Sequence, residues 1–202
     1  VKGVKSIQIE NDSSTLNAEK PYYPFTAQPI KGSNFYIKCP EMFSKKWLSA
    51  DVTINWKNTP DSIKDLYSGY VIQPNQNVSL TDFQAFKSSV VDSDAYFKAD
   101  TAILEKEIWH PKESNIEVFK KTEDGYKTQF SISSINNKAG DSESIRLTLN
   151  PSSLQDVYPT FYTLALSSDP TAGKLIPNEP YIPFAEDMEL HSSARATTPS
   201  YL

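Results

Sequence analysis

The sequence predicts a mainly β fold: an antiparallel β-sandwich or barrel-like domain with one or two short helices. Many short segments alternate apolar and polar residues, which is typical of half-buried strands, and turn-forming residues separate them. The chain has 11 Tyr and 10 Phe against 2 Met, and aromatic side chains favour pleated, half-buried surfaces. No alternating segment is followed by a long amphipathic helix, which disfavours a parallel α/β fold.

The clearest strand is expected at residues 51–57, where Val52, Ile54 and Trp56 alternate with polar residues. This phase predicts that Trp56 belongs to the core. Strands are predicted by the same reasoning at residues 4–10, 33–38, 51–57, 78–91, 116–120, 127–135, 143–150 and 188–194. Residues 11–15 are expected to form a turn-rich linker. Pro40 ends the strand predicted at residues 33–38. Together these segments predict seven to nine short strands.

Helices are expected to be few and short. Pro60 and the acidic residues after it are typical of a helix start, and the apolar spacing at residues 60–70 is helical. Residues 40–48 are compatible with one or two helical turns, and residues 157–166 with a short helix. Residues 102–109 fit either a helix or a strand.

Two proline-aromatic segments stand near the two ends of the chain. The N-terminal connector, residues 20–29, reads KPYYPFTAQP, and the C-terminal connector, residues 175–183, reads LIPNEPYIP. Proline fixes φ and lacks an amide donor, so neither segment can be helix interior or central strand. Each is therefore expected to be extended, with its rings packed flat on a neighbouring surface.

These connectors carry a resemblance to a known family. Residues 16–37, with the connector followed by GSNFYI, resemble a segment of baseplate wedge proteins, often called baseplate J-like, of phage-tail-like contractile injection systems. The IRLTL run at 145–149, the YPTFYTLAL run at 158–166 and PNEPYIP at 177–183 resemble later motifs of that family in the same order. The family shows Asp-Tyr where this chain has His191-Ser192, so the resemblance weakens at the last strand.

The resemblance implies a structural, non-catalytic domain of a wedge subunit that mediates subunit assembly. The implied partners are other wedge subunits and copies of the same protein, assembled in the bacterial cytoplasm into a particle that the cell can release. The candidate interface consists of connector residues, whose extended backbone loses little entropy on docking: Pro21, Tyr22, Tyr23, Phe25, Pro180, Tyr181 and Pro183. Packing of these rings on the domain's own sheet edges is an equal alternative.

The domain organisation expected from these patterns has three parts. Residues 1–15 form an N-terminal strand and linker, residues 16–194 a β-rich domain bracketed by the connectors, and residues 195–202 a tail. The chain starts at Val1, and wedge subunits are much longer than its 202 residues. We therefore expect it to be a fragment of a longer protein.

Composition narrows the possible partners. The formal charge is −5, from 20 Lys and Arg against 25 Asp and Glu, and charges of one sign do not form long runs. This balance disfavours nucleic-acid binding, which needs a basic patch. No apolar run approaches 18 residues, so no membrane-spanning segment is expected. The single cysteine, Cys39, excludes an intrachain disulfide.

No catalytic, cofactor-binding or metal-binding residues are predicted. Glu107 and His110 form a Glu-x-x-His pattern, but a di-iron bundle needs two copies on long helices. Cys39 beside Lys38 could be an activated thiol, although a small apolar residue ending a strand explains it better. Two clusters of acidic residues could ligate calcium, but neither lies in a glycine-rich and carbonyl-rich loop, so we expect them to be solvated on loops and strand faces. The clusters are Asp92, Asp94 and Asp100, and Glu186, Asp187 and Glu189.

The alternative function is a carbohydrate-binding or adhesive β-sandwich. It would use an exposed platform formed by some of the chain's aromatic residues: Trp47, Trp56, Trp109, Tyr22, Tyr23, Tyr36, Tyr67 and Tyr70. In a β-sandwich such rings more often fill the core or an interface. The two functions make different predictions: an adhesive module exposes two or three rings together, whereas a wedge domain presses its connectors against the sandwich.

Overall fold

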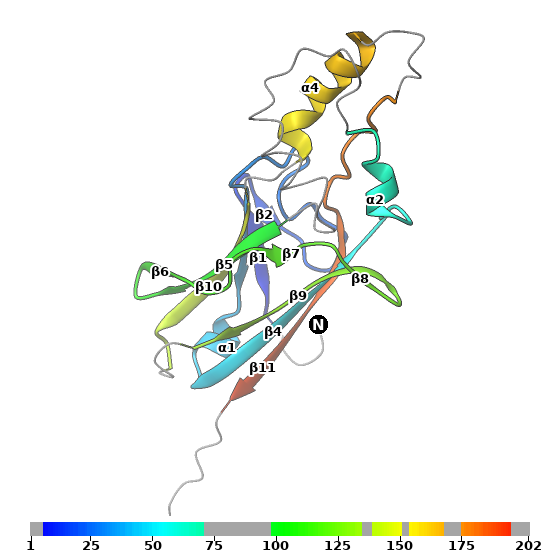
Figure 1. Ribbon diagram of the computed structural model, residues 1–202. Helices are drawn as coiled ribbons and strands as arrows, with labels where there is room; N and C mark the ends of the chain where they lie inside the picture. The colour runs from blue at the N-terminus through cyan, green and yellow to red at the C-terminus, as the bar shows by residue number, and fades with distance from the viewer. Residues whose placement is uncertain (1–5, 71–97, 135–138, 151–153, 168–174, 195–202) are drawn as a thin grey trace, which may run out of the picture.

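A computed structural model of the chain describes residues 6–70, 98–134, 139–150, 154–167 and 175–194. The fold is mainly antiparallel β and consists of two sheets, as the sequence predicts (Figure 1). Three short helical segments complete the described structure: α1 (Pro40–Phe43), α2 (Ile63–Leu66) and α4 (Leu154–Ser167). The α2 and α4 helices lie together beyond one end of the sheets, and α1 lies near the opposite end (Figure 1).

Sheet A has seven strands, six of them in the spatial order β2-β1-β3-β10-β5-β6, and β7 also pairs with β5. All of its strand pairs are antiparallel. Its strands are β1 (Gln8–Asn11), β2 (Thr15–Leu16), β3 (Asn34–Lys38), β5 (Lys98–Glu105), β6 (Ile108–Pro111), β7 (Ile116–Glu117) and β10 (Ser142–Leu149). Because β1 pairs with β3, the N-terminal strand is an integral part of the sandwich.

Sheet B has four strands in the order β11-β4-β9-β8, again all antiparallel. Its strands are β4 (Trp47–Trp56), β8 (Lys120–Thr122), β9 (Gly125–Ser133) and β11 (Ala185–Ala194). The β4 and β11 strands have ten residues each and pair along most of their length.

The core is formed by alternate residues of both sheets, as a period of two requires. Trp56 is 8% exposed and donates its indole N–H to the carbonyl of Val118, which confirms its predicted core position. The inward side chains of the two sheets form one buried cluster, which includes Ile9, Phe35, Ile37, Ile103, Ile145, Leu147, Val52, Ile54, Phe130, Ile132, Met188 and Leu190.

The predicted single strand at residues 116–120 is wrong, because the chain changes sheets there. The β7 strand pairs with β5 of sheet A, whereas β8 pairs with β9 of sheet B. Between them Val118 and Phe119 are buried in the core. Alternation alone does not reveal this crossing, since the apolar residues of β7 and of the buried link, Ile116, Val118 and Phe119, follow one another with no turn-forming residue between them.

The ambiguous segment at residues 102–109 is a hairpin between β5 and β6. Its turn places Lys106 and Glu107 at φ 49° and 65°. Non-glycine residues rarely adopt this left-handed region, and without glycine or asparagine the sequence does not signal the turn. The Glu-x-x-His pattern therefore spans a turn and a strand instead of a helix.

Several predicted boundaries also shift. Within residues 40–48 only Pro40–Phe43 is helical, because Trp47 already begins β4. The helix expected at 60–70 is confined to Ile63–Leu66, whereas the one expected at 157–166 extends over Leu154–Ser167. The first described strand begins at Gln8. The strand predicted at residues 78–91 lies outside the described residues.

Candidate functional site: the paired connectors

The two connectors, far apart in sequence, meet in the folded chain. Tyr22 of the N-terminal connector forms an isolated antiparallel bridge with Ala185, the first residue of β11. The Tyr22 N–H donates to the Ala185 carbonyl at 3.0 Å, and the Ala185 N–H donates to the Tyr22 carbonyl at 2.8 Å. The C-terminal connector ends at residue 183, two residues before this bridge. The N-terminal connector is therefore attached to the start of β11, close to the end of the C-terminal connector.

The predicted extended course is wrong for part of the N-terminal connector, because the chain turns there: the Thr26 N–H donates to the Tyr23 carbonyl at 3.3 Å, and Thr26 has a φ of 69°. This connector is held mainly by its rings. Tyr22 and Phe25 are 5% and 0% exposed, and both rings pack on Phe35 of β3, with centroids 5.8 and 6.4 Å away. Burial is the main reason why the pKa of Tyr22 is raised well above its usual range. Within the described residues the Tyr22 hydroxyl has no hydrogen-bond partner. Apolar burial thus dominates this connector.

The C-terminal connector is held mainly by hydrogen bonds to the α2 segment. The Tyr70 hydroxyl donates to the Asn178 carbonyl at 2.8 Å, and the Tyr181 N–H donates to the Tyr67 hydroxyl at 2.9 Å. The Asn178 side-chain amide donates to the Leu66 carbonyl at 2.9 Å. Prolines cannot donate backbone hydrogen bonds, so these neighbouring groups supply the contacts that position the connector.

Gly69 allows the C-terminal connector to approach this closely. A Cβ atom at this position would lie 2.9 Å from the carbonyl oxygen of Ile176 and 2.9 Å from the Cα of Pro177. Both contacts are with backbone atoms, which cannot rotate away as a side chain can. Gly69 is therefore required by close backbone approach, a recognised use of glycine.

Tyr181 connects the C-terminal connector to the core. Its hydroxyl donates to the carbonyl of Lys57, just after β4, and its ring packs on Phe119 with centroids 5.3 Å apart. Phe119 in turn packs on Trp56 at 5.1 Å. Burial is the main cause that raises the pKa of Tyr181 to about 12.

Most of the seven candidate interface residues contact their own domain. Tyr22, Phe25, Pro180 and Pro183 are buried, and Tyr181 is half-buried. Pro21 is exposed, and Tyr23 is 39% exposed although its ring packs on Phe184 at 4.5 Å. Pro21 and Tyr23 are thus the members best placed for contact with another molecule. The assignment of all seven to an intermolecular interface stays a prediction.

The predicted aromatic platform is largely buried. Trp47, Tyr67 and Tyr70 are at most 1% exposed. Only Tyr36 and Trp109 remain half-exposed together in sheet A, with ring centroids 6.0 Å apart. The guanidinium of Arg146 lies over the Trp109 ring, 4.3 Å from its centroid.

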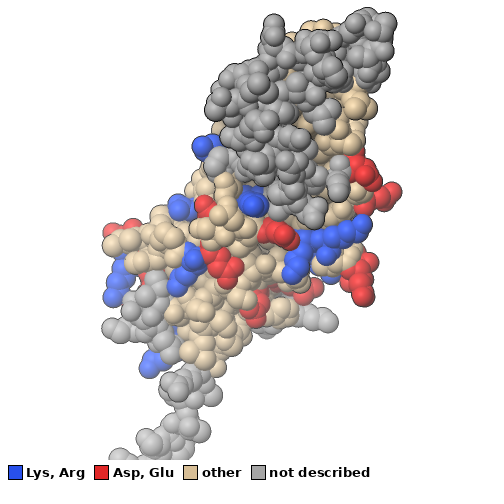
Figure 2. All heavy atoms as spheres, viewed as in Figure 1, with Lys and Arg blue, Asp and Glu red and all other residues tan. Residues whose placement is uncertain are grey.

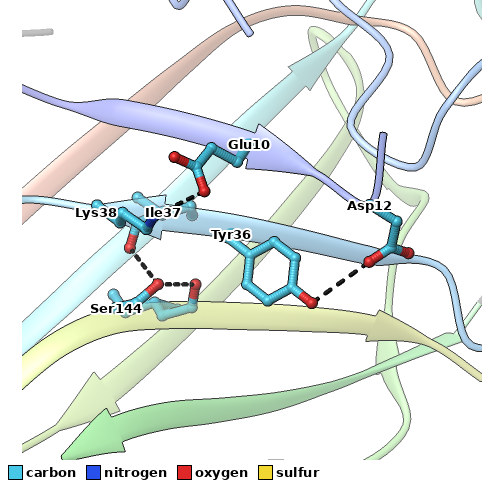
Figure 3. A network of polar contacts seen from close by, with 7 residues as sticks. Glu10, Asp12, Tyr36, Ile37, Lys38 and Ser144 are labelled. Carbon is cyan, nitrogen blue, oxygen red and sulfur yellow. Dashed lines mark hydrogen bonds and ion pairs between the residues drawn. The ribbon is translucent and has the colours of Figure 1, made fainter. Parts of the chain in front are cut away.

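Polar side chains surround Tyr36 on this face of sheet A (Figure 3). Its hydroxyl points toward Asp12 and donates to a carboxylate oxygen at 3.4 Å, and Lys38 pairs with Glu10 at 2.7 Å. Burial, followed by the negative charge of Asp12, raises the pKa of Tyr36. The sequence did not predict the hydrogen bond of Asp12 to Tyr36 or the packing of Arg146 on Trp109. The alternation of residues 143–150 places Arg146 outside the core, but no local signal places it over Trp109.

The other titratable candidates lie in ordinary surroundings. Cys39 is buried between β3 and α1, and burial raises its pKa, which disfavours a reactive thiolate. Glu186 pairs with Lys57 at 2.6 Å, and Glu189 contacts His191 at 3.3 Å. Asp92 and Asp94 lie outside the described residues. Within the described residues, no three His, Cys, Asp or Glu side chains are grouped closely enough to hold a metal ion.

No family model matches the chain, and no curated protein gives a significant match. Among the described residues, none of the helices has the length and apolar character needed to cross a membrane. The face seen in Figure 2 carries interspersed acidic and basic side chains over the sandwich.

Proposed function

We propose that this chain is a structural domain of a baseplate wedge subunit in a contractile, phage-tail-like injection system. In this role it mediates assembly with other wedge subunits and with copies of the same protein, and it performs no catalysis. The particle is assembled in the bacterial cytoplasm, and the cell can release it. The domain holds one arrangement of subunits until a signal favours another.

The observation that supports this proposal is the attachment of the N-terminal connector to the chain just beyond the C-terminal connector. The motifs behind the resemblance include these two proline-aromatic segments, and Tyr22 of the first forms two backbone hydrogen bonds with Ala185, two residues after the second. Their rings pack against the sandwich, as expected of a wedge domain, instead of forming a solvent-facing groove. Such a pre-ordered segment can present Pro21 and Tyr23 to a partner at little entropic cost.

The test is affinity purification of the full-length parent protein from its native host, followed by mass spectrometry of the co-purifying proteins. Sheath, tube and other baseplate proteins in the eluate would support the proposal. The same purification with Tyr23→Ala tests the connector, because that side chain is exposed. Ile108→Ala is the matched control, since Ile108 is 60% exposed on β6, away from the connectors. An eluate free of baseplate proteins would contradict the wedge assignment.

A carbohydrate-binding module is the second candidate, and the Tyr36–Trp109 pair favours it. These two half-exposed rings, with Asp12 and Arg146 beside them, offer a stacking surface with polar neighbours. A glycan array probed with the chain tests this function. Binding that is lost in Trp109→Ala, while Ile108→Ala still binds, would support it; no glycan binding would contradict it.

A further inference from the structure

The outer edge of β11 is the longest open edge of the described sheets. The β11 strand has ten residues, whereas the edge strands β2, β8 and β6 have two, three and four. Natural sheets protect their edges with short strands, lysines or prolines. The β8 strand begins with two lysines and β6 ends at Pro111, but β11 contains neither lysine nor proline. The β11 edge is instead protected by negative charge and by irregular pairing at its two ends, and charge of one sign does not exclude a strand of the opposite charge.

The middle of β11 is also regular. Its pairing with β4 continues without a register shift from Asp187 to Ser193, and irregularities occur only at the two ends. Within the described residues, the outer edge of β11 is paired only at Ala185, by Tyr22. The remaining edge can therefore accommodate another strand.

The hydrogen-bond pattern shows which backbone groups point outward. The backbone N–H of Lys57, just after β4, donates to the carbonyl of Phe184, just before β11, and the backbone N–H of Ser134, just after β9, donates to the carbonyl of Leu48 in β4. The backbone groups of odd-numbered β4 residues therefore point toward β11, and those of even-numbered residues toward β9. Antiparallel strands alternate in this way. Glu189 and His191, opposite Thr53 and Asp51, therefore bond to β4. The backbone groups that face the open edge belong to Met188, Leu190 and Ser192.

The side chains along this edge favour a basic partner. The β11 strand carries three exposed carboxylates, Glu186, Asp187 and Glu189, and neither lysine nor arginine. Lys57 already pairs with Glu186, which reduces the negative charge at that end of the edge. On β4, Asp51 adds a further carboxylate opposite His191. Opposite charges on neighbouring strands stabilise a sheet, and like charges destabilise it.

We propose that the outer edge of β11 accepts an extended segment of another polypeptide that carries Lys or Arg at alternate positions. The segment adds a fifth strand to sheet B, with main-chain hydrogen bonds for affinity and charge for specificity. The inference deepens the proposed assembly role and rests on it for the existence of a partner. Two copies that paired through β11 would bring together two strands with three carboxylates each, which disfavours a second copy as the occupant.

The test measures amide hydrogen exchange by NMR in the 202-residue chain with a capped probe peptide of alternating lysine and threonine, ten residues long like β11. A peptide with glutamate in place of lysine is the control. We expect the lysine peptide to slow exchange at Met188, Leu190 and Ser192 by about tenfold or more. Exchange at Glu189 and His191, which already bond to β4, should change little.

Two variants test the backbone and the charge separately. Ser192→Pro removes a backbone N–H that points to the open edge and leaves the hydrogen bonds between β11 and β4 intact. Edge strands tolerate proline at such outward-facing positions. The substitution should weaken peptide binding about tenfold or more without unfolding the chain. Glu189→Lys should weaken binding of the lysine peptide and strengthen that of the glutamate peptide. Glu117→Lys makes the same charge change on β7 and should leave both affinities unchanged.

Three results would overturn the proposal. One is unchanged exchange at the three outward amides. A second is protection of these amides in the free chain at low concentration, which would mean that the chain covers its own edge. A third is protection that rises with concentration together with dimers in sedimentation, which would identify a second copy as the occupant. If the parent carrying Ser192→Pro still co-purifies with baseplate proteins while the peptide has no effect, the edge proposal fails and the wedge assignment stands.

Discussion

The two connectors are similar in sequence, but different forces hold them. In the N-terminal connector Tyr22 and Phe25 are buried against Phe35, and the Tyr22 hydroxyl has no partner among the described residues. At the C-terminal connector, the hydroxyls of its own Tyr181 and of Tyr67 and Tyr70, which follow α2, all take part in hydrogen bonds. Ring burial predominates in the first segment, whereas in the second tyrosine hydroxyls add polar contacts to the burial of Pro180 and Pro183.

This difference shows that proline-aromatic composition does not predict how such a segment is held. A tyrosine in such a segment contributes its ring, its hydroxyl or both, depending on what the fold places opposite it. The following changes separate these contributions, from the largest expected effect on the free energy of unfolding to the smallest.

Phe25→Ala should have the largest effect, because the side chain is 0% exposed. The loss of a buried phenylalanine costs about 3–5 kcal/mol, measured by urea unfolding. Trp56→Ala is the reference, since Trp56 pairs with Ala185 and supports both connectors, and should cost a similar amount. A loss below about 1 kcal/mol for Phe25→Ala would contradict the view that ring burial holds the N-terminal connector.

Gly69→Ala should destabilise the C-terminal connector specifically. The new Cβ would collide with the backbone of Ile176 and Pro177 at 2.9 Å, and overpacking of this kind costs about 1–3 kcal/mol. Hydrogen exchange should then accelerate at Tyr181, whose N–H bonds to Tyr67, and not at Tyr22. Gly32→Ala controls for the loss of a glycine in open space, although its φ of 83° adds local strain. Equal acceleration at both connectors would contradict a specific contact.

Tyr70→Phe and Tyr22→Phe should have opposite outcomes. The Tyr70 hydroxyl donates to Asn178, so its removal should cost about 1 kcal/mol. The Tyr22 hydroxyl is buried without a partner in the described structure, so its removal should be neutral or stabilising, since a buried unpaired polar group is unfavourable. Thermal unfolding of the two variants side by side measures this difference. A larger loss for Tyr22→Phe would reverse the comparison.

Alkaline pH should weaken the C-terminal connector. The pKa of Tyr181 is raised from 10.0 to about 12, mainly by burial, so the unfolded chain loses this proton first as the pH rises. The contribution of neutral Tyr181 is complete below about pH 10 and is lost between about pH 10 and 12. Burial also raises the pKa of Tyr22 and Tyr70, so the loss continues at higher pH. Urea unfolding of Tyr181→Phe over this range should show a shallower decline; an unchanged slope would contradict this role.

Tyr23→Ala should have the smallest effect on stability. The side chain is 39% exposed and packs on Phe184 alone among the described aromatic rings, so we expect a loss of about 1 kcal/mol or less. If the connector also contacts a partner, the same change should reduce co-purification of that partner. A loss of about 3 kcal/mol or more would show that Tyr23 is a core residue.

Sequence reasoning predicted the parts of the fold that depend on local chemistry. Alternation located the strands that became β3, β4, β9 and β10 within a few residues, because each has one buried and one exposed face. It failed at Lys106 and Glu107, where tertiary pairing of β5 with β6 imposes a left-handed turn on unsuitable residues. It also failed at residues 116–120, where two buried residues join different sheets.

The candidate site shows the same division. The sequence singled out Tyr22, Phe25 and Tyr181, and the packing of the connectors on their own sandwich was one of two alternatives. The extended backbone predicted at Phe25 is wrong, because that residue lies in a turn. The sequence offered no sign of Gly69, because the backbone that excludes a side chain there lies more than a hundred residues away in the chain. Close approach is a property of the fold that glycine only permits.

The sequence by itself determined the β class and the core position of Trp56, because alternation acts on neighbouring residues. Only the tertiary structure decided that Tyr22 pairs with Ala185, that tyrosine hydroxyls contact one connector while two buried rings hold the other, and that most of the β11 edge is open among the described residues. These features depend on contacts between distant segments. Such contacts form where burial and hydrogen bonding across the whole fold outweigh local preference.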